Sequence, residues 1–206
     1  DAVLYLIHGM ADDGDYEARE RKAATRFIEA AAACGIRRVV YLGGVLPKGK
    51  ISKHLRSRRT TGEILRSHDA VSTIELRAGM VIGAGSASWD MIRDLAVRLP
   101  AMIFPKWLSY RSQPIAIQDV VAALLYALSM PEDKAGWYEL PGPEPMTGKE
   151  LLMRVAAIHG MRPVTISIPI ISPALSSYWL RFVTRADFKV AKELVLGMTD
   201  DLLPTG

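Results

Sequence analysis

The sequence predicts an α/β fold in which helices cover both faces of a parallel β-sheet, so that the molecule has three layers. Three short apolar segments, at residues 2–8, 38–42 and 72–76, are rich in branched and aromatic residues, which is typical of strands covered on both faces. Longer segments with helical periodicity separate them, and strands that alternate with helices in this way form parallel sheets. With 206 residues, half of them hydrophobic, the chain can bury a core without disulfides or metals.

The first half of the chain supplies this alternation of strands and helices. A helix is predicted from residue 15 to residue 34, and Gly35 is placed to end it. The predicted apolar face of this helix comprises Tyr16, Ala23, Phe27, Ala31 and Cys34. Ser52 is expected to cap a second helix over residues 52–66, and a third helix is expected over residues 86–99.

The second half follows a looser pattern of helices and strands. Extended segments are expected at residues 103–105, 114–117, 137–140 and 164–169. A buried helix is predicted over residues 119–130, with Asp119 as its N-cap. Thr147 and Glu150 have the spacing of a capping box ahead of a helix over residues 151–159. This mixture predicts a small α+β lobe beside the parallel sheet.

Composition and charge argue against several classes of protein. The formal net charge of +4 comes from basic residues spread along the chain, without the basic stripe and stacking aromatic residues of nucleic-acid binders, so no nucleic-acid partner is expected. The single cysteine, Cys34, excludes an internal disulfide, and the four histidines lack metal-ligand spacing, so no metal site is expected. One cysteine suits a reducing compartment and no signal peptide is recognisable, so we expect a cytoplasmic protein.

One uncharged stretch, residues 163–180, approaches the length that a membrane-spanning helix needs. Its three prolines and four serines argue against a continuous helix across a bilayer. We therefore expect this stretch to pack against protein, and membrane association is the less favoured alternative.

Candidate site residues lie where the predicted strands end, because open parallel sheets bind ligands beyond the carboxyl ends of their strands. The first strand is followed by His8-Gly9-Met10, the second by Gly43-Gly44, and the third by Ala78-Gly79-Met80-Val81. Small residues let a flat ligand approach the backbone closely, although glycines also end strands for purely structural reasons.

The glycine-rich turn that grips a pyrophosphate, G-x-G-x-x-G, does not occur in the chain. Gly83-Ala84-Gly85 does not replace it, because Ser88 stands where the third glycine is needed. We therefore expect the chain to be an interior fragment whose phosphate-binding turn precedes Asp1, or else to have no dinucleotide site.

Six segments that span nearly the whole chain occur in a characteristic order. They are AVLYLIHGM (2–10), RVVYLGG (38–44), HLRSR (54–58), ELRAGMVIG (75–83), PIAIQDV (114–120) and YELPGPE (138–144). In this order they resemble the later two-thirds of an atypical short-chain dehydrogenase/reductase, in the NmrA-like, NAD(P)H-binding branch that is also described as NAD-dependent epimerase/dehydratase-like.

The resemblance implies a Rossmann fold whose first half precedes Asp1. Residues 1–99 would then form the C-terminal part of an NAD(P)-binding domain, and residues 100–206 a small substrate-side lobe interleaved with the sheet. The implied cofactor is NAD or NADP. The residues implied on the cofactor side are His8, Gly9, Met10, Gly43, Gly44, Arg58, Ala78, Gly79, Met80 and Val81.

Working enzymes of that family carry Tyr-x-x-x-Lys on the helix after the second of these strands, and a serine or threonine at the end of that strand. The tyrosine exchanges a proton with the substrate, while the lysine lowers the tyrosine pKa and holds the ribose. Here His54 and Arg58 stand at the two helix positions, and Gly43-Gly44 replaces the hydroxyl residue. Arg58 can still hold a ribose or phosphate. His54 is the candidate acid/base, although nearby arginines should disfavour its protonated form.

The sequence therefore predicts an NAD(P)-binding, short-chain dehydrogenase-like protein with His54 and Arg58 as its candidate catalytic residues. Its chemistry would be that of an oxidoreductase or of an epimerase/dehydratase-type enzyme, on a small or sugar-nucleotide-like substrate. The loss of the tyrosine and serine favours an alternative, a non-catalytic NAD(P) sensor that acts through a protein partner. A third hypothesis, a membrane-associated assembly factor, depends on residues 163–180.

Overall fold

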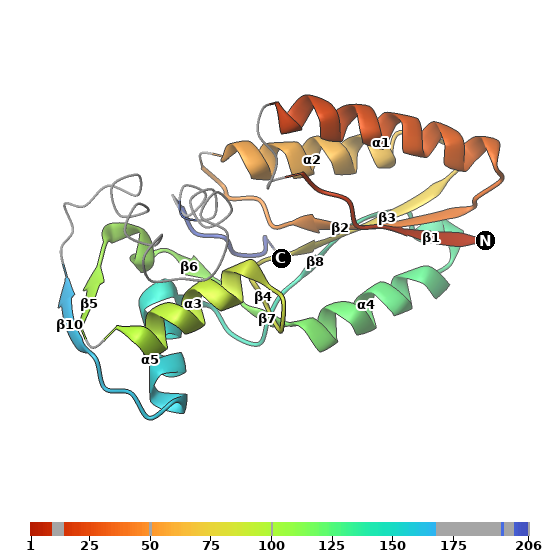
Figure 1. Ribbon diagram of the computed structural model, residues 1–206. Coiled ribbons are helices and arrows are strands. Elements are labelled where there is room, and N and C mark those ends of the chain that lie inside the picture. The colour runs from red at the N-terminus through yellow and green to blue at the C-terminus, as the bar shows by residue number, and fades with distance from the viewer. Residues whose placement is uncertain (10–14, 50, 100, 168–194, 196–199, 206) are drawn as a thin grey trace.

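A parallel sheet forms the centre of the molecule in the computed structural model, which describes residues 1–9, 15–49, 51–99, 101–167, 195 and 200–205. Among these residues the sheet has four strands in the order β1-β2-β3-β8 (Figure 1). The strands are β1 (Ala2–Tyr5), β2 (Arg38–Gly44), β3 (Ser72–Ala78) and β8 (Gly136–Leu140). Every pairing within this sheet is parallel, as in the register Leu4–Val40–Ile74 across the first three strands.

Helices cover both faces of the sheet. Helix α1 (Tyr16–Ala33) follows β1 and helix α2 (Lys53–Leu65) follows β2, and the two pack side by side on one face. Helix α4 (Ile117–Ser129) covers the other face (Figure 1). This arrangement confirms the predicted three-layer, Rossmann-like α/β class. It also brings the carboxyl ends of β2 and β3 to the same edge of the sheet.

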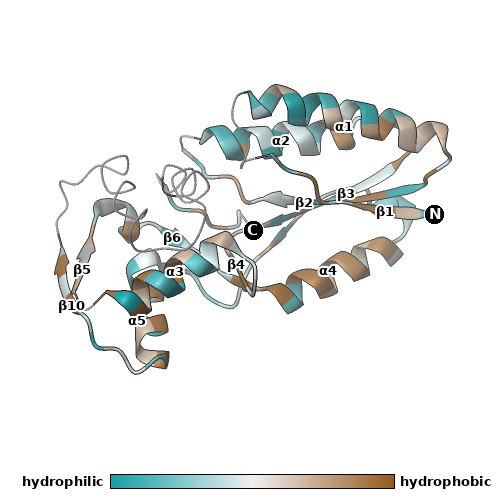
Figure 2. Cartoon of the chain, viewed as in Figure 1, coloured by the Kyte–Doolittle hydropathy of each residue, from teal (hydrophilic) through white to brown (hydrophobic). Residues whose placement is uncertain are grey.

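The helices differ in how apolar they are. In Figure 2, α1 and α2 alternate between polar and apolar residues, whereas α4 is apolar along most of its length. Helix α4 packs Val120, Leu124 and Ala127 against the sheet and leaves Leu125 and Tyr126 exposed. The α4 layer is therefore held to the sheet mainly by aliphatic contacts.

A smaller lobe follows β3. There, β4 (Val81–Ile82) leads into α3 (Ala87–Arg98), and the N-cap hydroxyl of Ser86 accepts a 3.3 Å hydrogen bond from the Trp89 amide. Helix α5 (Gly148–Ile158) packs against α3 and begins with the predicted capping box of Thr147 and Glu150. The remaining elements are β5 (Ala101–Phe104), η1 (Lys106–Ser109), β6 (Arg111–Ser112), β7 (Ile115–Ala116), η2 (Glu132–Lys134), β9 (Met146–Thr147) and β10 (Val164–Ser167).

Buried apolar residues form three clusters within the described part of the chain. Val39 and Leu65 belong to the cluster between the sheet and the α1–α2 layer, and Ile74 and Val120 to the cluster beneath α4. Trp107 lies in the cluster of the smaller lobe. Fully burying a large apolar side chain contributes roughly 1.5–3 kcal/mol to the stability of the fold. Each cluster therefore stabilises the packing of the elements that form it.

The buried face of α1 differs from the predicted one. It comprises Tyr16, Glu20, Ala24, Ile28 and Ala31. Ala23 and Phe27 are only half-buried, and Cys34 is exposed at the C-cap instead of lying on the apolar face. The observed face is rotated from the predicted one because the Glu20 side chain turns inward and accepts hydrogen bonds. A prediction that considers only apolar residues does not detect a buried glutamate.

Two predicted helix caps also differ from the structure. Helix α4 begins at Ile117 with Ala116 at the N-cap position, so Asp119 lies within the first turn and is not the cap. Ser52 occupies the N-cap position of α2, but its hydroxyl makes no capping hydrogen bond and lies 3.1 Å from His54 Nδ1. Both segments keep the helix that the sequence predicts.

The uncharged stretch at residues 163–180 lies mostly outside the described residues. Its described part includes β10, which pairs with β5 in parallel. Across the described ranges, no helix is both long enough and apolar enough to cross a membrane.

A buried carboxylate connects β3 to α2. The Glu75 side chain is 1% exposed, with Arg66 Nε 3.0 Å from Oε2 and Arg77 Nε 2.8 Å from Oε1. The Arg77 guanidinium also lies over the Trp137 ring, 4.3 Å from its centroid. A side chain at Gly62 would overlap the Glu75 carboxylate, so glycine lets α2 close over it. The carboxylate tolerates burial because two arginines compensate its charge.

Replacing Glu75 with alanine is expected to lower the free energy of unfolding by about 3–5 kcal/mol, because it leaves two guanidinium groups without their counter-ion. Urea denaturation followed by circular dichroism measures this change. Glu63→Ala, on the exposed side of α2, is the matched control and should change stability by less than about 0.5 kcal/mol. A Glu75→Ala loss no larger than that of the control would contradict the prediction.

Candidate functional site

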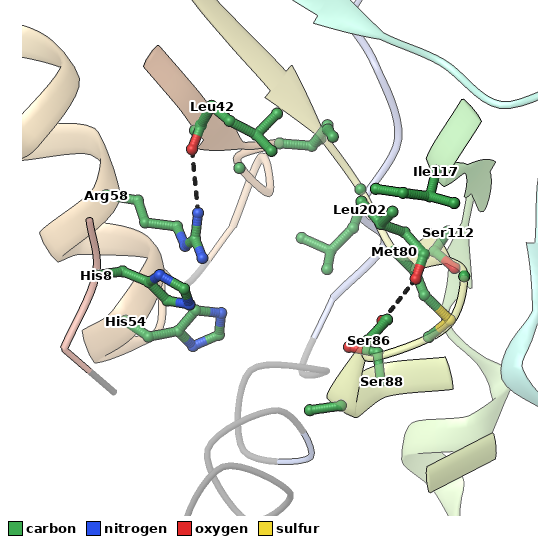
Figure 3. Close-up of a pocket in the computed structure, with 18 of the residues that line it drawn as sticks. His8, Leu42, His54, Arg58, Met80, Ser86, Ser88, Ser112, Ile117 and Leu202 are labelled. Carbon is green, nitrogen blue, oxygen red and sulfur yellow. Dashed lines mark hydrogen bonds between the residues drawn. The ribbon is translucent and has the colours of Figure 1, made fainter. Parts of the chain in front are cut away.

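A pocket of about 690 Å³ opens at the carboxyl ends of β2 and β3. Its volume lies within the range of about 300–1,000 Å³ that small-molecule sites occupy. One wall comes from α2 and the segment after β1, and the opposite wall from β4, the start of α3 and the second half of the chain (Figure 3). This is the edge at which open parallel sheets bind ligands.

Glycines shape the pocket where β2 ends. Gly43 and Gly44 both line it. A Cβ atom at Gly44 would lie 3.1 Å from Leu55 Cδ2 and 3.4 Å from Arg58 Cδ, so a larger residue would crowd these two side chains of α2. Gly44 therefore does more than end a strand, because it lets α2 approach β2 closely.

Helix α2 carries His54 and Arg58 to the same wall of the pocket, because four residues make about one helical turn. Arg58 Nη1 donates a 3.3 Å hydrogen bond to the Leu42 carbonyl (Figure 3). The Tyr41 hydroxyl donates to the Arg58 carbonyl, also at 3.3 Å. Both bonds tie α2 to β2, so the guanidinium is held at the rim of the pocket.

His54 is neutral at physiological pH. Its side chain is buried, and burial together with the positive charge of Arg58 lowers the pKa of His54 to about 4. The charge of Arg58 therefore lowers the pKa of His54, as predicted, but desolvation lowers it more. Nδ1 lies 3.1 Å from the Ser52 hydroxyl, whereas Nε2 has no hydrogen bond within the described residues. The neutral ring can therefore offer Nε2 to a ligand.

The segment after β1 is held beside this wall by Glu20. The Gly9 amide and the Ser57 hydroxyl donate to the two oxygens of the Glu20 carboxylate. His8, one residue earlier, lines the pocket. Desolvation and the charge of Arg58 lower the pKa of His8, although a backbone hydrogen bond and Glu20 oppose them. Sequence reasoning missed Glu20, and its one signal was a carboxylate in line with the apolar residues Ala24, Ile28 and Ala31 on one face of α1.

The opposite wall contains residues that the sequence did not single out. Figure 3 shows Ser112, Ile117 and Leu202 beside Met80, across the pocket from His54. These residues lie near the chain's middle and end. Ile117 belongs to the segment PIAIQDV, but no motif marks Ser112 or Leu202. Their proximity follows from the short strands β6 and β7, which pair with distant segments.

The structure gathers most of the predicted site residues in one place. Those that line the pocket are His8, Gly43, Gly44, His54, Arg58, Ala78, Gly79, Met80 and Val81. Gly9 does not line it, and the Gly9 amide donates a hydrogen bond to the Glu20 carboxylate. Met10 lies outside the described residues. No group of three potential metal ligands occurs in the part of the chain that the structure describes.

Known proteins resemble this chain in structure but not detectably in sequence. No protein-family model matches it, and no curated protein is a significant match. MoeE5 in complex with UDP-glucuronic acid and NAD is similar with a TM-score of 0.67 and 16% identity, over 98% of this chain and 77% of that one.

Two further solved structures show the same fold. UDP-N-acetylglucosamine 4-epimerase from Bacillus cereus has a TM-score of 0.67 at 16% identity, over 99% of this chain and 79% of its own. A short-chain dehydrogenase/reductase superfamily protein from Agrobacterium tumefaciens, with bound NAD, has a TM-score of 0.61 at 20% identity, over 96% and 78%. At these identities the comparison establishes the fold, a Rossmann-like α/β sandwich.

The buried neutral state of His54 predicts that acid destabilises the protein. Unfolded histidine has a pKa near 6.5, so as pH falls from about 6.5 towards 4 the unfolded state gains a proton that folded His54 excludes. The stability contributed by the neutral ring is complete above about pH 6.5 and is lost below it. Between about pH 7 and pH 5, the loss from this residue should be about 2 kcal/mol.

Urea denaturation of the wild type and of His54→Gln at both pH values measures this loss. The variant should lose less stability on acidification than the wild type. His159→Gln, at the exposed C-cap of α5, should leave the wild-type pH dependence unchanged. An identical pH dependence in His54→Gln and the wild type would show that the ring does not exclude the proton.

Proposed function

We propose that this protein binds NAD or NADP and acts as an oxidoreductase or epimerase/dehydratase-type enzyme on a small or sugar-nucleotide-like substrate. The observation that carries the proposal is the shared placement of His54 and Arg58 on one wall of a pocket at the carboxyl ends of β2 and β3. MoeE5 and the A. tumefaciens protein, which share the fold, were both solved with NAD, and this supports the assignment.

The pocket has features that suit the nicotinamide end of the coenzyme. Arg58 presents a fixed guanidinium that can donate to a ribose hydroxyl or a phosphate. Gly43, Gly44 and Gly79 leave backbone open to a flat ring, and Met80 and Val81 offer it apolar contacts. When bound, the coenzyme would accept or donate a hydride. NAD and NADP are both retained in the proposal.

His54 would bind a substrate oxygen. The hydroxyl of Ser52 holds Nδ1, so Nε2 can hydrogen-bond a carbonyl or hydroxyl in the pocket. A neutral imidazole can polarise a carbonyl without carrying a positive charge. However, general acid–base catalysis works best when the pKa lies near the working pH, and the pKa of His54, about 4, is lower. We therefore expect His54 to orient and polarise the substrate more than to store a proton.

The two halves of the chain would then bind different molecules, the first half the coenzyme and the second half the substrate. Residues 1–99 contribute His54 and Arg58, and we propose that they form the coenzyme-side unit. Residues 100–206 contribute Ser112, Ile117 and Leu202, and we propose that they form the substrate-side lobe. We also propose that the substrate is a small molecule and that the protein is cytoplasmic.

A non-catalytic NAD(P) sensor that acts through a protein partner is the second candidate. It is favoured by the low pKa of His54 and by Gly43-Gly44, which supply no hydroxyl where the related enzymes carry one. Such a protein would bind coenzyme through Arg58 but would not turn it over. The following two experiments separate binding from catalysis.

Arg58→Ala is expected to weaken coenzyme binding about 10- to 150-fold, because it removes a charge-assisted hydrogen bond worth roughly 1.5–3 kcal/mol. Isothermal titration of the full-length protein with NAD and NADP measures the dissociation constants. Arg56→Ala is the matched control, since Arg56 lies on the same helix but pairs with Glu17 outside the pocket. Equal affinities for both variants and the wild type would remove Arg58 from the coenzyme site.

His54→Ala is expected to lower kcat for NAD(P)H-dependent turnover at least tenfold while leaving coenzyme affinity within about twofold, because His54 is assigned to the substrate oxygen. Steady-state turnover across a panel of ketones and sugar nucleotides, measured with the coenzyme titration, gives both quantities. Unchanged turnover would exclude this role for His54. Tight coenzyme binding without turnover in the wild type would favour the sensor.

A further inference from the structure

Three titratable side chains line the pocket within the described residues, and all of them belong to the wall formed by α2 and the segment after β1. They are His8, His54 and Arg58. In the same part of the chain, no aspartate, glutamate, lysine, tyrosine or cysteine lines the pocket. A titratable side chain that exchanges a proton with a ligand in this pocket is therefore one of these three.

Two of the three groups keep one protonation state near neutral pH. Arg58 stays charged, because a guanidinium does not lose its proton in proteins. His54 is buried, and desolvation together with the charge of Arg58 lowers its pKa to about 4, so its ring stays neutral. Proton exchange is most efficient when the pKa of the group lies near the working pH. His8 is the remaining candidate.

His8 lies beside His54 but in a different environment. Figure 3 shows the two rings next to each other on the wall that carries Arg58. His8 is exposed, whereas His54 is buried. Desolvation and Arg58 lower the pKa of His8, but a backbone hydrogen bond to Leu6 and the negative charge of Glu20 oppose them. Neither opposing cause acts on His54, so His8 gains and loses its proton closer to neutral pH.

Glu20 contributes an anchor as well as a charge. Its side chain is buried, and Oε1 accepts a 2.5 Å hydrogen bond from the Gly9 amide, whose nitrogen belongs to the peptide bond that follows His8. Oε2 accepts a hydrogen bond from the Ser57 hydroxyl of α2. The backbone at His8 is therefore fixed relative to the helix that carries His54.

We propose that His8 exchanges a proton with the substrate oxygen, and that Glu20 is the positioning residue of His8. Reduction of a carbonyl forms a C–H bond with a hydride from the coenzyme and an O–H bond with a proton from protonated His8. The ring is then neutral, and it regains a proton from solvent because His8 is exposed. Oxidation of an alcohol reverses these steps. This inference rests on the proposed function and deepens it, because it assigns the proton that His54 does not store.

Histidine NMR titrations of the full-length protein without coenzyme test the electrostatic part of the proposal. The His8 ring should titrate at a higher pH than the His54 ring. Glu20→Gln keeps an oxygen that can accept from Gly9 but removes the charge that favours protonated His8. It should therefore lower the pKa of His8 and leave that of His54 unchanged. Glu29→Gln, at an exposed position of α1, is the matched control and should shift neither ring.

Steady-state kinetics of coenzyme-dependent ketone reduction test the proton transfer itself. His8→Gln should lower kcat about 100-fold, a typical loss for a general acid. Glu20→Gln should move the pH profile of kcat/KM towards lower pH, in the same direction as the NMR titration, because this profile reports the pKa values of the free enzyme. His159→Gln, at the exposed C-cap of α5, should change neither quantity.

Thermal unfolding of each variant verifies that it is folded, and the wild-type titration and the His8→Gln kinetics do not depend on Glu20→Gln. The inference is overturned if His8 titrates no higher than His54, if Glu20→Gln shifts His8 no more than Glu29→Gln does, or if His8→Gln keeps the wild-type kcat. A wild type that neither binds nor turns over coenzyme overturns the proposed function, whereas an active wild type that tolerates His8→Gln overturns this inference alone.

Discussion

Helix α2 lies so close to β2 and β3 that glycine is needed at the points of contact, and the pocket depends on this approach. A Cβ atom at Gly44 of β2 would lie 3.1 Å from Leu55 Cδ2 of α2, and one at Gly62 of α2 would overlap the Glu75 carboxylate of β3. The close approach encloses Glu75 between Arg66 and Arg77. Because the helix is held at this distance, the side chains on its pocket-facing side cannot move away from the strand ends.

The same approach sets the chemistry of the polar wall. His54 is buried because α2 lies close to the sheet, and burial keeps its ring neutral. Arg58 is held by the Leu42 carbonyl and adds a positive charge that opposes protonation of the nearby histidines. The Glu20 carboxylate connects the segment after β1 to α2 through Ser57, so the packing of three elements determines the geometry of this wall.

The other wall has a different origin and a different chemistry. It is built from segments that lie between residue 80 and residue 202, brought together by strands only two residues long and by a single bridge between Ser112 and Leu202. Its apolar side chains include Met80, Ile117 and Leu202, and Ser86, Ser88 and Ser112 are its polar residues. A ligand between the two walls would meet the neutral imidazole of His54 and the Arg58 guanidinium on one side, and an uncharged wall of apolar and serine residues on the other.

Sequence reasoning succeeded where structure follows from local patterns. The strand–helix alternation, the helix stop at Gly35 and the capping box of Thr147 depend on neighbouring residues, and each is present. The predicted apolar face of α1 was wrong because Glu20 is buried, where its carboxylate accepts hydrogen bonds from Gly9 and Ser57. The cap assigned to Asp119 was wrong because β7 leads directly into α4, which starts two residues earlier.

The α/β class and the pairing of His54 with Arg58 on one helix face follow from the sequence alone, because periodicity and the four-residue spacing are properties of the local chain. The charge state of His54, the inward turn of Glu20 and the place of Ser112 in the pocket wall arise only when the chain is folded. These properties depend on burial and on contacts between residues that are far apart in the chain, and neither can be read from neighbouring residues.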